Sequence, residues 1–320
     1  MPYFSVIIPT FNRRDILKET ILSLSSQTFT DFELIIADDG SSDGTEKMVA
    51  ELKTSFPVRY QWHKNAGRSA ARNMGLKMAR GKVVVFIDDH VYSDSRLLEE
   101  HYNFHQKYGA TKIKVIRGFA PLVRDKSEIP AQAAYQDMST FKFKGENNPF
   151  ISFFTGNVSI DKAALEKVGG FEEDFKEYGF QDSELGYRLV KAGYHIKVNP
   201  NAIVYVFSAK LSFEKRCDKS RQAGHSAVVL LKKHFFLGIY VGINPFNLFM
   251  FMLFSLNNRY FLHKLYYNKL DLLENGSKEH EKVQSRIRYY YFLFGIYEKL
   301  FKTKSLQEYY AQKNPGSPLS

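Results

Sequence analysis

The sequence predicts an α/β protein with a doubly wound, mostly parallel sheet, followed by a helical C-terminal region. Apolar segments alternate with amphipathic ones over the first 90 residues, and acidic residues follow several of the apolar segments. This alternation stops after residue 206, where helical patterns take over. The 320 residues, 44% of them hydrophobic, are enough to bury a substantial core in one or two domains.

Each predicted element follows from the spacing of its apolar residues. Continuous apolar runs predict strands buried on both faces, whereas apolar residues three or four positions apart predict helices. The predicted strands are 3–9, 32–37, 82–87 and 112–119, and the predicted helices are 14–27, 43–56, 69–80, 95–108 and 183–192. The polar stretch 142–154 contains Gly, Asn and Pro, and it predicts a loop over the site.

The distribution of charge supports a division into two domains, 1–206 and 207–320. The second segment holds 18 Lys/Arg and 8 Asp/Glu, a net charge of +10, whereas the first is nearly balanced at +1. A basic C-terminal region indicates an anionic partner, either a membrane surface or nucleic acid. Because no recognised nucleic-acid-binding pattern occurs there, we expect no nucleic-acid partner.

The cellular location can be predicted from the cysteine content and the apolar segments. The single cysteine, Cys217, excludes an intramolecular disulfide and is typical of a reducing compartment. The N-terminal apolar run lacks a basic leader, so we expect a cytoplasmic protein, peripheral at the inner face of the cell membrane if the tail binds lipid. The uncharged residues 235–258 leave three alternatives: a spanning helix, an element in the membrane surface, or soluble packing that includes an oligomer interface.

Acidic residues gather where predicted strands end. Asp38-Asp39 and Asp88-Asp89-His90 follow two strands, and Gln181-Asp182 comes later in the chain. The carboxyl ends of parallel strands line one crevice in an open sheet, so we expect these groups to converge. Converging carboxylates repel a bare phosphate, which predicts a phosphate ligand accompanied by a divalent cation.

An ordered set of motifs resembles the family 2 inverting glycosyltransferases over residues 3 to about 206. The motifs are Ser5-Val6-Ile7-Ile8-Pro9-Thr10-Phe11-Asn12, Ala37-Asp38-Asp39-Gly40-Ser41-Ser42-Asp43, Asn65-Ala66-Gly67 with Ala71-Arg72-Asn73, Asp88-Asp89-His90, Thr155-Gly156-Asn157, and Gly169-Gly170-Phe171 before Gln181-Asp182. No single motif is decisive, but all occur in the order typical of the family. The resemblance implies the GT-A fold, a nucleotide-diphosphate-sugar donor and a divalent metal, Mn²⁺ or Mg²⁺.

The resemblance also implies a pocket for the nucleotide. Asp39 is expected to read a uracil ring, and Pro9, Thr10 and Phe11 are expected to wall the same pocket. The alternative is that Asp38 or Asp39 caps the helix that begins near Asp43.

The triplet Asp88-Asp89-His90 corresponds to the family's Asp-X-Asp pattern, which binds ribose and a metal. Counting from Gly81 aligns His90 with the second family aspartate, whereas counting back from Leu97 aligns Asp89. Asp89 and His90 are therefore both metal candidates, and Asp88 is expected at the ribose or behind the ligands. The alternative is a solvated turn with a lone histidine.

Two arginines and a glycine-containing segment are expected near the donor's diphosphate and sugar. Arg68 and Arg72 lie four residues apart near a helix start and could meet the diphosphate; the alternative is a pair of surface arginines. The resemblance places Thr155, Gly156 and Asn157 beside the donor sugar and acceptor.

Asp182 is the candidate catalytic base. An inverting transfer needs one group to accept the proton of the attacking hydroxyl, and no covalent enzyme intermediate. The alternative role is the N-cap of the following helix. The family usually has Glu-Asp here, so Gln181 is a departure that could alter acceptor choice or weaken activity.

A second departure follows Tyr205, where relatives often carry a histidine. Val206 and Phe207 stand there instead, and His225 is a possible substitute ligand. We expect a metal-dependent transferase that moves a sugar from a UDP-sugar to an acceptor hydroxyl, with a glycan or lipid-linked acceptor of the cell envelope. A nucleotidyltransferase would need a glycine-rich phosphate loop that this sequence lacks. A catalytically weakened relative, acting as a partner subunit, is the alternative.

Overall fold

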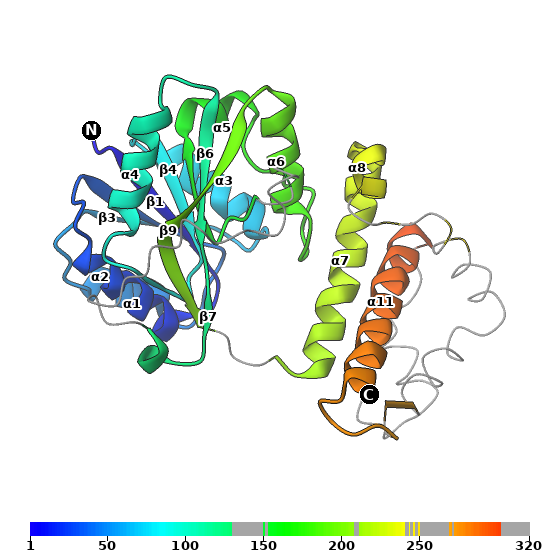
Figure 1. Cartoon of the computed structure of the whole chain (residues 1–320). Coiled ribbons are helices and arrows are strands. Elements are labelled where there is room, and N and C mark those ends of the chain that lie inside the picture. The colour runs from blue at the N-terminus through cyan, green and yellow to red at the C-terminus, as the bar shows by residue number, and fades with distance from the viewer. Residues whose placement is uncertain are drawn as a thin grey trace. The chain divides into compact units, whose positions relative to one another are not determined.

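The computed structural model describes residues 1–129, 150, 153–207, 211–240, 243, 246, 249, 269–270 and 272–301. The chain divides into two compact units (Figure 1). Unit 1 consists of Met1–Lys176 and Gln181–Ala209, and unit 2 consists of Glu177–Phe180 and Lys210–Ser320. Most of the predicted loop 142–154 lies outside the described residues.

Unit 1 is built on a nine-stranded, mostly parallel sheet with the order β3-β2-β1-β4-β8-β6-β9-β5, in which β7 also pairs with β9. The strands are β1 Phe4–Thr10, β2 Phe32–Asp38, β3 Val58–Trp62, β4 Val83–Ile87, β5 Val91–Ser93, β6 Ile113–Phe119, β7 Leu122–Val123, β8 Asn157–Asp161 and β9 His195–Phe207. The helices are α1 Arg14–Ser23, α2 Thr45–Glu51, α3 Arg68–Met78, α4 Leu97–Tyr108, α5 Lys162–Lys167 and α6 Gln181–Lys191, with short 3₁₀ turns at Leu24–Ser26 and Lys126–Glu128.

Helices cover both faces of this sheet because successive strand residues point to opposite sides. In β1, Val6 and Ile8 join the core formed with α1, α2 and α4, whereas Ile7 joins the core formed with α3, α5 and α6. All three side chains are fully buried. Figure 1 shows the two sets of helices on either side of the strands. The predicted doubly wound α/β class is confirmed.

The register of the parallel strands brings their carboxyl ends to one edge. Thr10 at the end of β1 pairs with Asp38 at the end of β2, and β1 also pairs with β4 in parallel. The polar residues that follow β1, β2 and β4 therefore begin at the same edge of the sheet.

The predicted helix 43–56 is shorter than expected. It begins at Thr45, after Gly44 in the left-handed conformation (φ 85°), and ends at Glu51. The edge strand β3 follows it, which the helical pattern had not indicated.

Unit 2 contains two long helices, α7 Phe213–Lys233 and α11 Lys278–Phe301, and the short α8 Phe235–Tyr240. Arg216 contacts Gln284 near the start of both long helices and Arg221 contacts Glu298 further along, so the pair is parallel. A Cβ at Gly224 or Gly295 would lie 2.1 or 2.0 Å from a backbone oxygen of the facing helix. These glycines therefore permit the close packing.

The helical C-terminal extension is confirmed in the part of the chain that the structure describes. Within those same residues, no helix has both the length and the apolar character needed to cross a bilayer.

Candidate active site

Asp89 is the centre of a hydrogen-bonded cluster at the ends of β1 and β4. Its Oδ2 accepts from Thr10 Oγ1 at 3.0 Å, and its Oδ1 accepts from Arg13 Nη1 at 2.8 Å. His90 Nδ1 lies 3.1 Å from Asp89 Oδ1 and 3.2 Å from Arg13 Nη1. Burial alone would raise the pKa of Asp89, but the hydrogen bond with His90 and the charge of Arg13 lower it. Asp89 is thus a buried carboxylate with its charge compensated.

The more accessible metal-type donors at this edge are Asp88 and His90. Their side chains are 25% and 28% exposed, compared with 9% for Asp89. Both carboxylate oxygens of Asp89 already accept hydrogen bonds from the protein. Among the residues that the structure describes, no group of three or more His, Cys, Asp or Glu could hold a metal. Asp88 and His90 could each supply one ligand to a cation that a diphosphate also binds. This geometry favours Asp88 and His90 over Asp89.

Asp39 ties the end of β2 to the start of α3. Its carboxylate accepts Ala66 N–H at 2.8 Å and Gly67 N–H at 3.1 Å. Asp38 instead accepts from Ser41 N–H and the Tyr60 hydroxyl, both at 2.7 Å. The N-cap of α2 is Gly44, so the alternative that Asp38 or Asp39 caps that helix is wrong.

The predicted walls of the base pocket differ in exposure. Thr10 is buried, Pro9 is partly exposed and Phe11 is 46% exposed. Phe11 therefore offers an accessible aromatic surface to a planar base, and Thr10 acts on the same edge through its hydrogen bond to Asp89.

Arg72 is a buried cation directed towards the acidic residues. Its Nη2 lies 3.6 Å from Asp88 Oδ1, and its guanidinium lies 5.4 Å from the centre of the Phe171 ring. Its Nε has no hydrogen-bond partner among the described residues, although it is buried. An unsatisfied guanidinium edge costs free energy unless a ligand completes it, and an anionic diphosphate has the right chemistry. Arg68, by contrast, is exposed at the first residue of α3.

Asp182 lies in the first turn of α6 and is bound to Thr155. Its Oδ2 accepts Thr155 N–H at 3.1 Å, and its Oδ1 accepts Thr155 Oγ1 at 2.9 Å. Because α6 begins at Gln181 and this carboxylate bonds to Thr155, the alternative that Asp182 is an N-cap is wrong. Burial raises the pKa of Asp182; Arg72 and Thr155 oppose the rise and Asp88 adds to it. The result is a fixed carboxylate with enhanced affinity for a proton.

Gly156 lies beside Asp88, whereas Asn157 is enclosed by other residues of unit 1. A Cβ at Gly156 would lie 2.9 Å from Asp88 Oδ2 and 2.3 Å from the Phe154 ring, so only glycine fits beside Asp88. Asn157 is fully buried, and its amide is satisfied by three protein groups. Its Nδ2 donates to Phe119 O and Ala202 O, and its Oδ1 pairs with His101 Nε2 at 3.0 Å.

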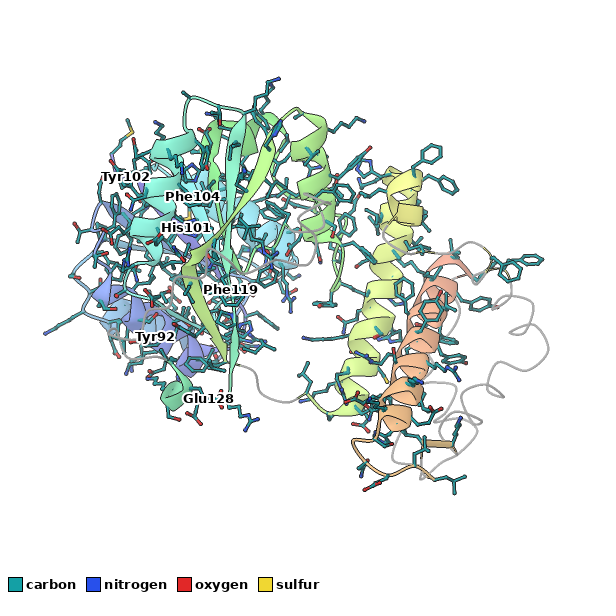
Figure 2. All side chains as sticks on the ribbon, viewed as in Figure 1. Tyr92, His101, Tyr102, Phe104, Phe119 and Glu128 are labelled. Atoms are coloured by element: carbon teal, nitrogen blue, oxygen red, sulfur yellow. The ribbon has the colours of Figure 1, made fainter. Side chains whose placement is uncertain are left out.

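The prediction that Asn157 contacts the donor sugar or acceptor is therefore wrong, because its polar atoms are enclosed. His101 and Phe119, which hold it, come from α4 and β6 and are labelled in Figure 2. Thr155 is also buried, at 2% exposure, and its side chain acts on Asp182.

His225 does not fit the role of a substitute metal ligand. Its Nδ1 lies 2.7 Å from Glu177 Oε1, and its Nε2 lies 3.1 Å from Glu298 Oε2, all within unit 2. Both ring nitrogens are thus engaged by carboxylates that lie on different sides of the ring. Gln181, the other departure from the family pattern, is the first residue of α6 and is partly exposed.

Sequence reasoning missed two side chains that complete the site. Arg13 follows β1 and pairs with Asp89, but a basic residue in a loop has no distinguishing pattern. Asn73 bonds Phe171 O and N–H, both at 2.8 Å, and so holds the ring that lies against Arg72. Its position next to Arg72 in the motif Ala71-Arg72-Asn73 could have indicated that Asn73 belongs to the site.

Comparison with known proteins adds the family. The family model described as glycosyl transferase family 2 matches residues 5–169, more than half of the chain, and one described as N-terminal domain of galactosyltransferase matches residues 136–210. A validoxylamine A glucosyltransferase of Streptomyces hygroscopicus subsp. jinggangensis is 31% identical, with 62% of this chain and 54% of the relative covered. A GalNAc(5)-diNAcBac-PP-undecaprenol beta-1,3-glucosyltransferase of Campylobacter jejuni is 42% identical, with 54% and 58% covered. The chain spans about half the length of these curated relatives.

Solved structures share the fold. A mannosyltransferase of Pyrobaculum calidifontis, in complex with GDP-Man and Mn²⁺, has a TM-score of 0.60 at 16% identity, covering 95% of this chain and 88% of that one. S. aureus TarS 1–349 in complex with UDP-GlcNAc has a TM-score of 0.51 at 19% identity, covering 92% and 89%. The structural likeness gives the GT-A fold, and the match over residues 5–169 shows that the chain belongs to glycosyl transferase family 2.

Proposed function

We propose that this glycosyltransferase inverts the anomeric centre as it moves a sugar from a UDP-sugar to an acceptor hydroxyl, with the help of a divalent cation. The observation that carries the proposal is the setting of Asp182. Two hydrogen bonds from Thr155 fix its carboxylate, and burial raises its pKa towards the range useful to a base. Arg72 and Asp88 act electrostatically on the same carboxylate.

The proposed reaction is a single displacement. The acceptor oxygen attacks the anomeric carbon on the face opposite the diphosphate, its proton passes to Asp182, and the bond from the anomeric carbon to the diphosphate oxygen breaks. Arg72 holds the negative charge that develops on the leaving group, since its Nε is buried without a protein partner among the described residues. Thr155 keeps Asp182 aimed during the transfer.

A cation at Asp88 and His90 would neutralise charge on the departing diphosphate. The exposed faces of these two side chains support that assignment, and the Mn²⁺ in the related mannosyltransferase complex is consistent with it. Asp89 supports the site from behind through Thr10 and Arg13.

The donor and acceptor follow from chemistry and from the relatives. Pro9 and Phe11 would bind the base beside Asp39, whose 6%-exposed carboxylate holds the Ala66 and Gly67 backbone and would add an acceptor for a base N–H. UDP is favoured because the complex of TarS carries UDP-GlcNAc; GDP and dTDP are the competing donors. A lipid-linked or glycan acceptor is supported by the undecaprenol-linked substrate named for the Campylobacter relative. In this proposal residues 1–206 bind the donor and catalyse transfer, and residues 207–320 serve the acceptor, a membrane or a second copy.

Calorimetry of the protein with UDP and with GDP, each with and without Mn²⁺, tests the donor site first. We expect UDP binding that requires Mn²⁺ and is weakened by His90→Gln. In a transfer or donor-hydrolysis assay, Asp182→Asn should lower the rate by about 10²- to 10⁴-fold while leaving UDP binding intact. The exposed Asp15→Asn is the matched control. Unchanged transfer by Asp182→Asn would remove the base assignment.

A catalytically weakened relative acting as a partner subunit is the second candidate, and Gln181 in place of the usual Glu is the observation that favours it. It predicts binding of a nucleotide without turnover of any donor. If the wild type turned over no donor and Gln181→Glu gave a measurable hydrolysis rate, the second candidate would gain support; measurable turnover of a donor by the wild type would exclude it.

A further inference from the structure

Two adjacent phenylalanines at the start of α8 are unusually exposed. Phe235 is 57% exposed and Phe236 is 84% exposed, and their rings pack edge to face with centres 5.7 Å apart. Lys232 and Lys233, at the end of α7, are exposed immediately before them. We refer to Lys232, Lys233, Phe235 and Phe236 as the Phe-Lys patch. It presents a large apolar surface beside two cations.

The sequence around the patch contains no negative charge. From residue 219 to residue 270 there are 7 Lys/Arg and no Asp or Glu, together with 11 aromatic residues. Phe246 and Phe249, in the same stretch, are 67% and 55% exposed. A soluble surface normally mixes both signs of charge, so a stretch of 52 residues without an acid is a strong compositional bias.

The chemistry of this combination selects the partner. Phenylalanine rings gain free energy on entering the boundary between lipid headgroups and acyl chains, and lysines beside them meet lipid phosphates. An acid-free stretch removes the repulsion that an anionic surface would otherwise exert. A protein partner would require acidic side chains opposite the lysines and a pocket for each ring, whereas a bilayer supplies both properties over its whole surface.

We propose that the Phe-Lys patch docks this chain on an anionic lipid bilayer, lying in the surface and not spanning it. The rings of Phe235 and Phe236 enter the headgroup boundary, and Lys232 and Lys233 contact lipid phosphates. This binding involves no catalytic step and no donor, so it extends the proposed function without depending on it.

Sedimentation with vesicles tests the proposal. The full chain is mixed with vesicles of phosphatidylcholine containing about 30% phosphatidylglycerol, an anionic content at which basic segments bind, or with phosphatidylcholine alone. We expect binding to the anionic vesicles that falls about tenfold in the pure phosphatidylcholine and at high salt. Phe235→Ser with Phe236→Ser should lower the partition coefficient about tenfold or more, as should Lys232→Gln with Lys233→Gln.

Leu272→Ser is the matched control. Leu272 is 85% exposed, also in unit 2, but in the sequence it lies between Asp271 and Glu274, so its loss should leave vesicle binding unchanged. Thermal melting of each variant checks that it is folded. The phenylalanine variant should melt within a few degrees of the wild type, because both rings are exposed.

Two outcomes would overturn the proposal. The first is equal binding of the wild type and the phenylalanine variant to anionic vesicles. The second is a change in sedimentation coefficient of the variant without lipid, which would identify the patch as a contact between two copies. Failure of UDP to bind in calorimetry would contradict the proposed donor and leave the vesicle result standing, so the two proposals fail separately.

Discussion

Each unit contains a hydrogen-bonded network that includes histidine, but the histidines of unit 1 are neutral and His225 of unit 2 is protonated. In unit 1, burial lowers the pKa of His101 to about 4 and of His105 to about 3. In unit 2, burial would lower the pKa of His225, but Glu177 and Glu298 outweigh it and raise the pKa to about 9. The neighbours, and not the histidine itself, therefore decide whether the network is neutral or charged.

In the neutral network, the donor and the acceptor of each hydrogen bond can be assigned in only one way. Asn157 Oδ1 can only accept, so the neutral His101 carries its proton on Nε2 and accepts from Ser159 Oγ on Nδ1. Ser159 Oγ then accepts from His105 Nε2 at 2.8 Å. The chain of donors fixes β8 to α4 directly after Gly156. Thr155, which binds Asp182, lies two residues before Asn157 at the start of β8. A neutral network there adds no charge close to that carboxylate.

The charged network joins helices instead of a strand. His225 lies between Glu177 Oε1 and Glu298 Oε2, and Arg221 adds a bond of 3.2 Å to Glu298. Two cations are compensated by three carboxylates where α7 meets α11 and the segment Glu177–Phe180, because Asp218 also accepts from Arg221 at 2.9 Å. Breaking either network should show which kind of polar cluster contributes more to its unit.

The largest effect is expected when the neutral network receives a charge. Asn157→Asp removes the donor to Phe119 O and Ala202 O and buries a carboxylate beside the neutral His101, so we expect a loss of about 3–5 kcal/mol in the free energy of unfolding. Urea denaturation measures this loss. Asn103→Asp, on the exposed face of α4, is the control and should change stability by less than about 0.5 kcal/mol.

A further result would sharpen the contrast. If the carboxylate introduced by Asn157→Asp raised the pKa of His101 enough to form an ion pair, the loss would be small and His101 would titrate above pH 7 by NMR. That outcome would show that the amide of Asn157 keeps His101 neutral, and that the surrounding site also tolerates a protonated His101.

A smaller effect is expected when the charged network loses a carboxylate. Glu298→Gln keeps the shape but leaves His225 and Arg221 with a weaker acceptor, so we expect a loss of about 2 kcal/mol in the stability of unit 2. The exposed Glu281→Gln on the same helix should cost less than about 0.5 kcal/mol. Equal losses from the two variants would mean that solvent already screens the buried cluster.

The same two regions show how far the sequence could predict the structure. The strand ends and the acidic positions could be predicted because the pattern of apolar residues is local, as in 82–87 before Asp88. The role of Asn157 could not, because its partners Phe119, Ala202 and His101 lie 38, 45 and 56 residues away. Long-range side-chain contacts of this kind leave no period in the sequence.

The site divides in the same way. Asp182, Arg72 and Asp88 were named from motifs, and the structure places Arg72 near both carboxylates. The pairing of Arg13 with Asp89, 76 residues apart, could not be predicted from the sequence. It makes Asp89 less accessible to a metal than the other two members of Asp88-Asp89-His90. Only the fold decides which carboxylate is already compensated.

The last expected difference between the units is in the pH dependence of their stability. The pKa values of His101 and His105 are lowered, so their stabilising neutral form is complete above pH 6.5 and is lost as pH falls through that value towards about 4 and about 3. The pKa of His225 is raised, so its contribution is complete below pH 6.5 and is lost as pH rises towards about 9. Unit 1 should therefore weaken on the acid side and unit 2 on the alkaline side, the latter less because solvent partly reaches the cluster.

NMR of the histidine ring protons, recorded from about pH 4 to about pH 10, follows the protonation of each ring. Urea midpoints at about pH 5, 7 and 9 measure how the stability of each unit changes with pH. His225→Gln should flatten the alkaline slope of unit 2 and leave the acid slope of unit 1 unchanged. If His225 titrated near its ordinary pKa of about 6.5, Glu177 and Glu298 would not stabilise the positive charge of the ring in solution. The two networks would then differ only in the burial of their histidines.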